Sequence, residues 1–230
     1  MMCKLSEEAI GDILRKGRIY EVGGAVRDRY LRLNQKVKDR DYLVTGIPYD
    51  ELTHILKSHG RVGLVGRSFG VIKFTQFKEE KQHTFDITLP RREHSTGAGH
   101  TDYEVDFDPD MKVEEDLVRR DFTVNAMALD LNDDSLIDPL GGQLDLEKRQ
   151  LRMTSPASFE EDPLRMLRAI QFSARFNFII EPETFKSLRE HAASIGSVSK
   201  ERITEELNKL LTRSAKPSDG FRLMLTSGLL

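Results

Sequence analysis

The sequence predicts an α+β fold, in which a mixed sheet with helices on one side is followed by an all-helical region. Up to Leu89, short strand-like patterns alternate with amphipathic ones in the order α-β-α-β-α-β-β-β. After residue 113 the apolar residues recur at i, i+3 and i+4, which is typical of helices. We therefore expect two domains, residues 1–150 and residues 151–230.

Local signals predict each element before Leu89. Ser6 can cap the first amides of an amphipathic helix, and Pro48 is typical of a helix start. Strands are expected where β-branched and aromatic residues cluster. The expected order is a helix at 6–16, a strand at 18–22, a helix at 25–33, a strand at 39–45, a helix at 48–58 and strands at 61–65, 71–75 and 83–89.

Residues 90–113 break this pattern, because they contain Gly97, Gly99, two prolines and several charges. We expect a long loop here, and a loop of this length inside a compact domain is usually functional or disordered. Three helices are expected after it, at 161–176, 182–193 and 200–212.

The composition excludes several classes of protein. A single cysteine, Cys3, rules out an internal disulfide framework and a zinc site made of cysteines. The N-terminus is charged from Lys4 onward and has no apolar signal core, and no apolar run approaches the roughly 18 residues of a membrane span. We expect a soluble, cytoplasmic protein with no membrane partner. The sequence leaves the oligomeric state open, and a monomer is expected.

Two aspartates separated by one residue form the first candidate site. On a strand, the spacing of Asp39 and Asp41 directs both side chains to one face. Two carboxylates on one face repel each other unless a cation lies between them, and oxygen ligands suit Mg²⁺. Asp86, on a neighbouring predicted strand, is the natural third carboxylate. Taken alone, D-x-D is more often a turn or a solvated strand edge.

Gly23–Gly24 follow a predicted strand and precede a predicted helix that carries Arg27. This arrangement allows the backbone to approach a triphosphate, and Arg27 adds positive charge, although such a pair is more often only a tight turn. GRSFG at 66–70 matches the G-x-S-x-G pattern of serine hydrolases, but a strand pattern follows where a helix is required. The six histidines lack the spacing of a zinc site.

Five segments in order carry a resemblance to a known family. GGAVRD (23–28) with KDRDYLV (38–44), RRDFTVNAMALD (119–130), DPLGGQLDL (138–146), EDPLRMLRAIQFSARF (161–176) and ERITEEL (201–207) resemble the motifs of class II tRNA nucleotidyltransferases and bacterial poly(A) polymerases. The resemblance implies a polymerase-β-like nucleotidyltransferase head followed by a helical neck. In that family a body and a tail would follow, and we expect them to be missing from this chain.

The resemblance also implies roles for individual residues. Asp39 and Asp41 would bind the catalytic metals, and Asp86 aligns with a further acidic position. Gly24 and Arg27 would contact the phosphates and sugar of the nucleotide.

Further nucleotide contacts are implied by the later motifs. Arg120 and Asn125 would lie close to the nucleotide. Asp162 and Arg165, one turn apart on a helix, would present hydrogen-bonding edges to the base, and Arg168 would contact phosphate from the same helix face. Without the other motifs, residues 161–176 would be read as a charged amphipathic helix. Gln171 departs from the family, which often has arginine there, and this leaves the nucleotide preference in doubt.

The implied activity is the Mg²⁺-dependent addition of CCA to the 3′ end of tRNA from CTP and ATP, without a nucleic-acid template. Addition of the terminal A alone and poly(A) synthesis share the same motifs and remain alternatives, and the length of the 90–113 segment argues against CC addition alone. A different class, an inactive module that only binds RNA or nucleotide, is disfavoured by the presence of Asp39, Asp41 and Arg120.

Overall fold

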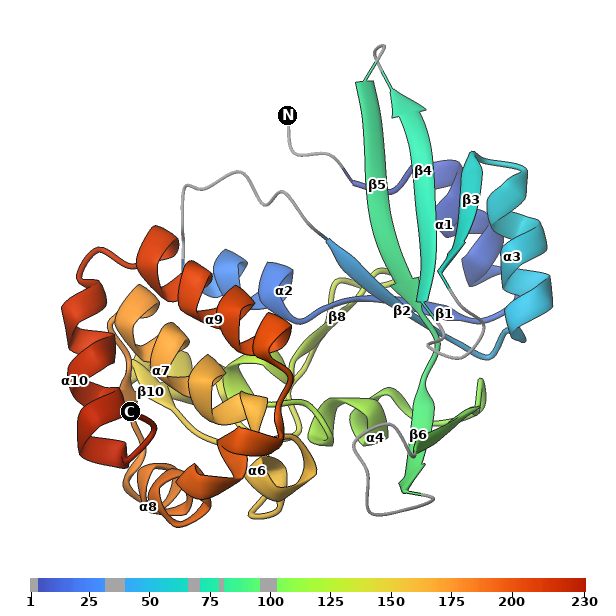
Figure 1. The fold of residues 1–230 in the computed structure, drawn as a ribbon. Coiled ribbons are helices and arrows are strands. Elements are labelled where there is room, and N and C mark those ends of the chain that lie inside the picture. The colour runs from blue at the N-terminus through green and yellow to red at the C-terminus, as the bar shows by residue number, and fades with distance from the viewer. Residues whose placement is uncertain (1–3, 32–39, 66–70, 79–80, 96–102) are drawn as a thin grey trace. The chain divides into compact units, whose positions relative to one another are not determined.

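The computed structural model describes residues 4–31, 40–65, 71–78, 81–95 and 103–230 (Figure 1). Within these residues the chain forms two compact units. One, the sheet unit, consists of Met1–Leu117 and Met127–Pro139, and the other, the helical unit, consists of Val118–Ala126 and Leu140–Leu230. The division differs from a single boundary at residue 150, because two short segments before that residue pack with the later helices. The two-domain boundary itself stays a prediction.

The sheet unit follows the predicted order of elements. Ser6 accepts a hydrogen bond from the amide of Ala9 at 3.3 Å and so caps the first helix, as expected. The helices of this unit are α1 (Glu7–Leu14), α2 (Gly24–Tyr30), α3 (Tyr49–Lys57) and α4 (Val113–Val118). The strands of its main sheet are β1 (Arg18–Val22), β2 (Asp41–Thr45), β3 (Arg61–Val65), β4 (Val71–Lys78), β5 (Lys81–Thr88), β8 (Ala128–Asp130) and β9 (Leu136–Ile137).

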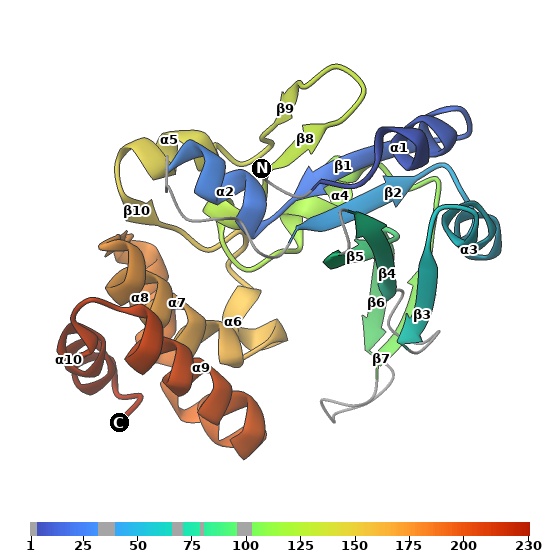
Figure 2. The same cartoon turned by 90° about the horizontal axis from the view of Figure 1, so that it is seen from above.

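The main sheet is mixed, which confirms the predicted fold class. Its strand order is β3-β4-β5-β2-β1-β8-β9, and Figure 2 shows it from above. Strands β2 and β5 pair in parallel, and the other neighbours pair antiparallel. Among the described strands of this sheet, β2 and β5 are therefore the one neighbouring pair that runs in the same direction.

One face of this sheet is covered by α1 and α3. Their apolar side chains share a buried cluster with those of alternate strand residues, so one face of each strand is directed into the core. Tyr42 and Val44 of β2 and Ile87 of β5 belong to this cluster, and Tyr42 makes an edge-to-face contact with Phe85. Asp41 and Asp86, which alternate with these residues, are directed to the opposite face.

The expectation of a loop over residues 90–113 was wrong. Strands β6 (Arg91–Ser95) and β7 (Tyr103–Phe107) pair antiparallel and form a separate two-stranded ribbon. The residues between them lie outside the described part of the chain. The ribbon escaped prediction because its pairing uses backbone groups, which polar and charged residues supply as well as apolar ones.

The helical unit contains the three predicted helices and several shorter elements. Helix α7 packs against α9 and α10. The elements are η2 (Thr123–Asn125), α5 (Gly142–Glu147), β10 (Gln150–Leu151), α6 (Ser158–Glu161), α7 (Leu164–Phe176), β11 (Ile179–Ile180), α8 (Pro182–His191), η3 (Ala192–Ser197), α9 (Lys200–Arg213) and α10 (Pro217–Ser227).

The structure bears on two interpretations that the sequence disfavours, a serine hydrolase and a membrane-spanning protein. The G-x-S-x-G segment lies outside the described residues, but it is followed by strand β4, where a nucleophile elbow requires a helix. Among the helices that the structure describes, none combines the length and the apolar character needed to cross a membrane.

Candidate functional site

Asp41 and Asp86 lie side by side on the face of the sheet opposite α1 and α3. They are register partners in the parallel pair of β2 and β5, and residues in register on neighbouring strands project to the same face. Both residues are half-buried. Neighbouring strands lie about 4.8 Å apart, so two carboxylates placed in this way repel each other unless positive charge is close.

The donor set fits a hard divalent cation. Carboxylate oxygens are the ligands that Mg²⁺ prefers, and these two come from rigid strands rather than loops. Lys73, the register partner of Asp86 on β4, has its Nζ atom 3.8 Å from the Asp86 carboxylate and offsets part of the repulsion. Asp39, the other expected ligand, lies outside the described residues, and within those residues no cluster of three potential metal ligands occurs.

The turn into α2 requires glycine at residue 23. Gly23 has φ 69° and ψ −132°, a conformation that side chains with a Cβ atom rarely adopt. Its amide donates to the carbonyl of Met127 at 3.4 Å, which holds the turn against the residue that precedes β8. At Gly24, an added Cβ atom would lie 3.4 Å from Nη2 of Arg27. This is an ordinary contact distance, so the position of the guanidinium does not by itself require glycine at residue 24.

Arg27 is buried beside this turn. Its Nε and Nη2 atoms donate to Oδ1 of Asp28 at 2.8 and 2.6 Å. Burying a guanidinium charge costs free energy unless an anion lies close to it, and Asp28 supplies that anion here. The predicted phosphate contact of Arg27 therefore stays a prediction, since the guanidinium already has a carboxylate partner.

In the helical unit, the carboxylate of Asp121 is the centre of a hydrogen-bond network. Its Oδ1 atom accepts from the Phe122 amide at 2.8 Å and from Nδ2 of Asn125 at 2.9 Å. Its Oδ2 atom accepts from Nε and Nη2 of Arg168 at 2.9 and 2.5 Å. The structure thus joins two predicted nucleotide-binding residues, Asn125 and Arg168, through a third residue.

The charges of this network support each other. Burial raises the pKa of Asp121, but the Arg168 charge and the hydrogen bonds from Asn125, Arg168 and Phe122 outweigh it and hold this pKa below its usual value of 3.8. Burial likewise lowers the pKa of Arg168, and the charge of Asp121 more than offsets this. Arg168 also lies 3.8 Å from buried Glu206 and stacks over the Phe172 ring.

Arg165 holds the segment before Asp121 in place. Its Nη2 atom donates to the carbonyl of Arg119 at 2.9 Å, and its Nη1 atom donates to the hydroxyl of Ser158 and the carboxylate of Glu161, both at 3.0 Å. The next carbonyl, that of Arg120, accepts from the hydroxyl of Thr154. The backbone that carries Arg120 is therefore fixed by side chains from two other elements.

Asp162 does not lie on a helix with Arg165, contrary to prediction. Helix α6 ends at Glu161, Asp162 is extended with φ −144° and ψ 99°, and α7 begins after Pro163. A residue before proline avoids helical backbone angles, which explains the break. Oδ1 of Asp162 instead accepts from the Leu164 amide at 3.2 Å, and its Oδ2 accepts from Arg202 at 2.9 Å.

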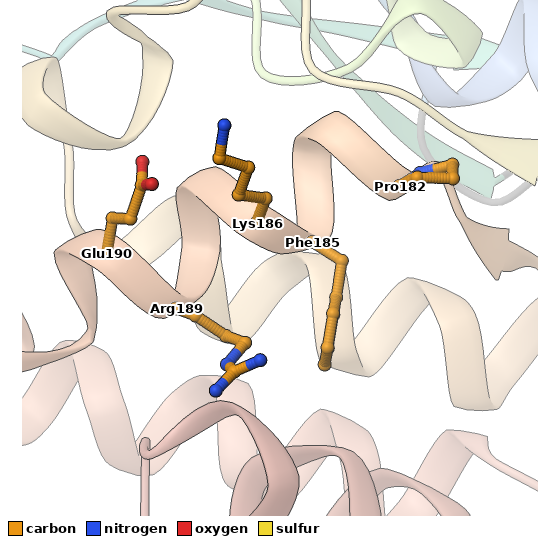
Figure 3. A pocket seen from close by; sticks show the side chains of 5 residues that line it. All are labelled: Pro182, Phe185, Lys186, Arg189 and Glu190. Atoms are coloured by element: carbon orange, nitrogen blue, oxygen red, sulfur yellow. The ribbon is translucent and has the colours of Figure 1, made fainter.

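A surface pocket of about 420 Å³ lies elsewhere, along α8. Figure 3 shows Phe185 and Arg189 extending from one side of the helix and Lys186 and Glu190 from the other. Its lining residues are Pro182, Phe185, Lys186, Arg189 and Glu190. None of the predicted site residues lines it, so this pocket is not the candidate site.

Residues 19–152 match the family model of the poly(A) polymerase head domain, and residues 177–230 match the model described as the probable RNA and SrmB-binding site of polymerase A. The chain belongs to the poly(A) polymerase head-domain family. Its fold is that of the polymerase-β-like nucleotidyltransferase head, followed by a helical region.

Relatives of this poly(A) polymerase head-domain chain include the multifunctional CCA protein of Nitrosococcus oceani, with 43% identity over 216 residues, and that of Stenotrophomonas maltophilia, with 42% over 212. These matches cover 92% and 90% of the chain and 49% and 48% of the relatives. The chain thus spans about half the length of the curated relatives it matches.

Solved structures show the same relation. The crystal structure of the Bacillus stearothermophilus CCA-adding enzyme in complex with CTP matches with a TM-score of 0.80 and 29% identity. The match covers 96% of this chain and 51% of that chain. An apo form of a CCA-adding enzyme matches with a TM-score of 0.80 and 30% identity, and covers 96% and 52%.

Three residues that contact the predicted site residues were missed by the sequence reasoning on this family member: Asp121, Arg202 and Glu206. Asp121 stands beside Arg120 in the RRD segment, so the motif itself offered the signal. Glu206 and Arg202 belong to the ERITEEL segment, which lies on α9. The structure shows that these two side chains contact Arg168 and Asp162.

Proposed function

We infer that this chain is the nucleotidyl-transferring part of an enzyme that adds CCA to the 3′ end of tRNA from CTP and ATP. The observation that carries the proposal is the register of β2 and β5, which places Asp41 beside Asp86 on one face. The names of the relatives and the CTP complex of a similar structure support the choice of substrates. The reaction needs no nucleic-acid template and releases pyrophosphate.

Asp41 and Asp86 would hold Mg²⁺, together with Asp39 by its place in the sequence. Bound there, the ion would favour the ionised 3′ hydroxyl and neutralise the charge that develops on the pyrophosphate. The strands hold the two carboxylates on one face before substrate binds, so little reorganisation is needed. Lys73, close to Asp86, would offset part of the negative charge that the two carboxylates bring together.

The helical unit would select the nucleotide. Arg offers donors and Asp offers acceptors, so Arg165 and Asp162 carry groups complementary to a base edge. Both are engaged in this structure, Arg165 with Arg119, Ser158 and Glu161, and Asp162 with Arg202. Base recognition would therefore exchange internal contacts for contacts to the nucleotide, and Arg120, Asn125 and Arg168 would complete the site.

The decisive experiment compares three tRNA substrates. They end before CCA, after the first C and after CC, and each is offered CTP or ATP separately. CCA addition predicts CTP incorporation on the first two and ATP incorporation on the third. Addition of A alone predicts no CTP incorporation. Poly(A) synthesis, which the family model's description favours as the second candidate, predicts ATP addition without a fixed limit.

Asp41→Asn separates an enzyme from an inactive binding module. It removes a metal-binding charge while keeping the shape of the side chain, so incorporation should fall by on the order of 100-fold or more. Glu8→Gln, which removes an exposed carboxylate from the first turn of α1, is the matched control and should keep full activity. Equal incorporation by the two variants would contradict the proposed role of Asp41.

A further inference from the structure

A buried ion pair involves the residue next to Asp41 in the chain. Glu21 on β1 and Arg40, the residue before β2, are each only 3% exposed. Nη1 of Arg40 donates to Oε1 of Glu21. Arg40 stands between Asp39 and Asp41, so the pair is attached to the chain at the centre of the D-x-D segment.

The pair lies on the opposite face of the sheet from Asp41. Glu21 is the register partner of Tyr42, and register partners share a face. Tyr42 belongs to the core that α1 and α3 cover, so Glu21 is directed to that side. The side chain of Arg40 reaches Glu21 there. Alternation along the chain then directs Asp41 to the opposite face.

Glu21 also connects a second part of the site. Its Oε2 atom lies 3.9 Å from Nη2 of Arg29, which is on α2, one residue after Asp28. A single carboxylate thus joins the helix that follows the Gly23–Gly24 turn to the segment that precedes β2. These are the two segments of the first sequence motif, and neither Glu21 nor Arg29 belongs to that motif.

Stability alone does not account for this pair. Removing two charges from water costs free energy that their attraction only partly restores, so an apolar pair of similar volume is often as stable. Nε of Arg40 is buried and has no hydrogen-bond partner within the described part of the chain, which adds to the cost. Buried ionic groups of this kind are retained in some proteins because they specify one conformation.

We propose that Glu21 and Arg40 are positioning residues for the metal-binding carboxylates. Anchoring Arg40 on the core side fixes the rotation of the chain at the start of β2 and thereby orients Asp41 toward Asp86. The proposal rests on the proposed function, because it assumes that Asp41 and Asp86 bind a divalent cation. It adds the residues that set their geometry.

The test replaces the ion pair with apolar residues and measures folding and metal binding separately. The double variant Glu21→Leu/Arg40→Met should unfold at a temperature close to that of the wild-type chain, since the buried charges are removed together. Its affinity for Mn²⁺ alone, measured by electron paramagnetic resonance, should fall by about 10-fold, the lower end of the effect of outer-shell changes. Wild-type affinity in the double variant would overturn the proposal.

Further variants separate positioning from a general loss of structure. Arg40→Lys keeps one charged donor, and the observed contact uses one nitrogen, so Mn²⁺ affinity should stay within about twofold of wild type. Arg40→Met alone should lose Mn²⁺ affinity. Glu51→Gln breaks the exposed pair with Lys16 and is the matched control, with unchanged Mn²⁺ affinity.

Failure of the proposed function would give a different result. If Asp41→Asn binds Mn²⁺ as tightly as the wild-type chain, Asp41 is not a ligand, and both proposals fall. If Asp41→Asn loses Mn²⁺ while Arg40→Met keeps it, the metal site stands and only the positioning role is overturned. If the double variant does not fold, the comparison of Arg40→Lys with Arg40→Met still decides the matter.

Discussion

Replacing Asp121 with asparagine tests whether the charge of this side chain holds α7 to the 118–126 segment. Asparagine keeps an acceptor for the Phe122 amide and for Asn125, the two contacts at Oδ1. Asparagine lacks the charge that faces Arg168, and its amide nitrogen takes the place of Oδ2, which accepts two hydrogen bonds from Arg168. The substitution therefore removes the ion pair with little change of shape.

The expected loss of stability follows from the burial of the ion pair between Asp121 and Arg168. Breaking a buried ion pair by removing one partner costs about 3–5 kcal/mol. Asp121 is 8% exposed, but the side chain of Arg168 is 32% exposed and also lies near Glu206, so solvent and a second carboxylate compensate part of its charge. We expect Asp121→Asn to lower the free energy of unfolding by about 2–3 kcal/mol at pH 7.

Urea unfolding followed by circular dichroism measures this difference, and a double-mutant cycle with Arg168→Met isolates the pair. The coupling energy should be about 2 kcal/mol. Glu183→Gln is the control, because it breaks an exposed pair with Lys186 at 3.9 Å and should change stability by less than about 0.5 kcal/mol. A coupling energy near zero would refute the ion pair as the source of the effect.

The pH dependence of stability provides an independent check that the charge of Asp121 stabilises the folded chain. The pKa of Asp121 is lowered in the folded chain, so the unfolded chain binds its proton first as the pH falls. The stabilisation by this carboxylate is therefore complete above about pH 5 and is lost as the pH falls below 3.8 toward the folded pKa. The difference between wild type and Asp121→Asn should shrink over that range. If the difference in stability between wild type and Asp121→Asn stays constant over that range, the loss of stability comes from packing and not from the charge.

Two further substitutions test local features by thermal unfolding. Gly23→Ala should destabilise the chain by about 1–3 kcal/mol, because alanine is strained at the backbone angles of Gly23. Gly11→Ala, in an open position on α1, should instead stabilise the chain by up to about 1 kcal/mol. Equal effects of the two substitutions would refute backbone strain at residue 23. Gln171→Leu should stabilise the chain by about 1 kcal/mol, because the buried Nε2 atom of Gln171 has no hydrogen-bond partner among the described residues, and a marked loss of stability would contradict this.

Most elements could be predicted because their periodicity is local. The helices at α1 and α3 and the strands up to β5 follow patterns that a short window of sequence contains. The ribbon of β6 and β7 and the short strands β8 and β9 could not, because their pairing depends on backbone partners and not on an apolar pattern. Asp162 was misplaced because the motif match was given more weight than Pro163, whose effect on the preceding residue is a local rule.

The sequence by itself determined which residue types could carry the chemistry. The D-x-D spacing predicts that two carboxylates lie on one side of a strand, because side chains alternate along it. The ordered motifs identified the family, which the family model confirmed.

Only the tertiary structure decided which distant residues meet. Asp86 lies beside Asp41 because β5 pairs in parallel with β2, and no local pattern specifies that register. Glu21 meets Arg40, and Asp121 meets Arg168, because long-range packing brings separate elements together. Contacts of this kind depend on the whole arrangement of strands and helices. The neighbour of Asp41 therefore followed from the fold, whereas its spacing from Asp39 followed from the sequence.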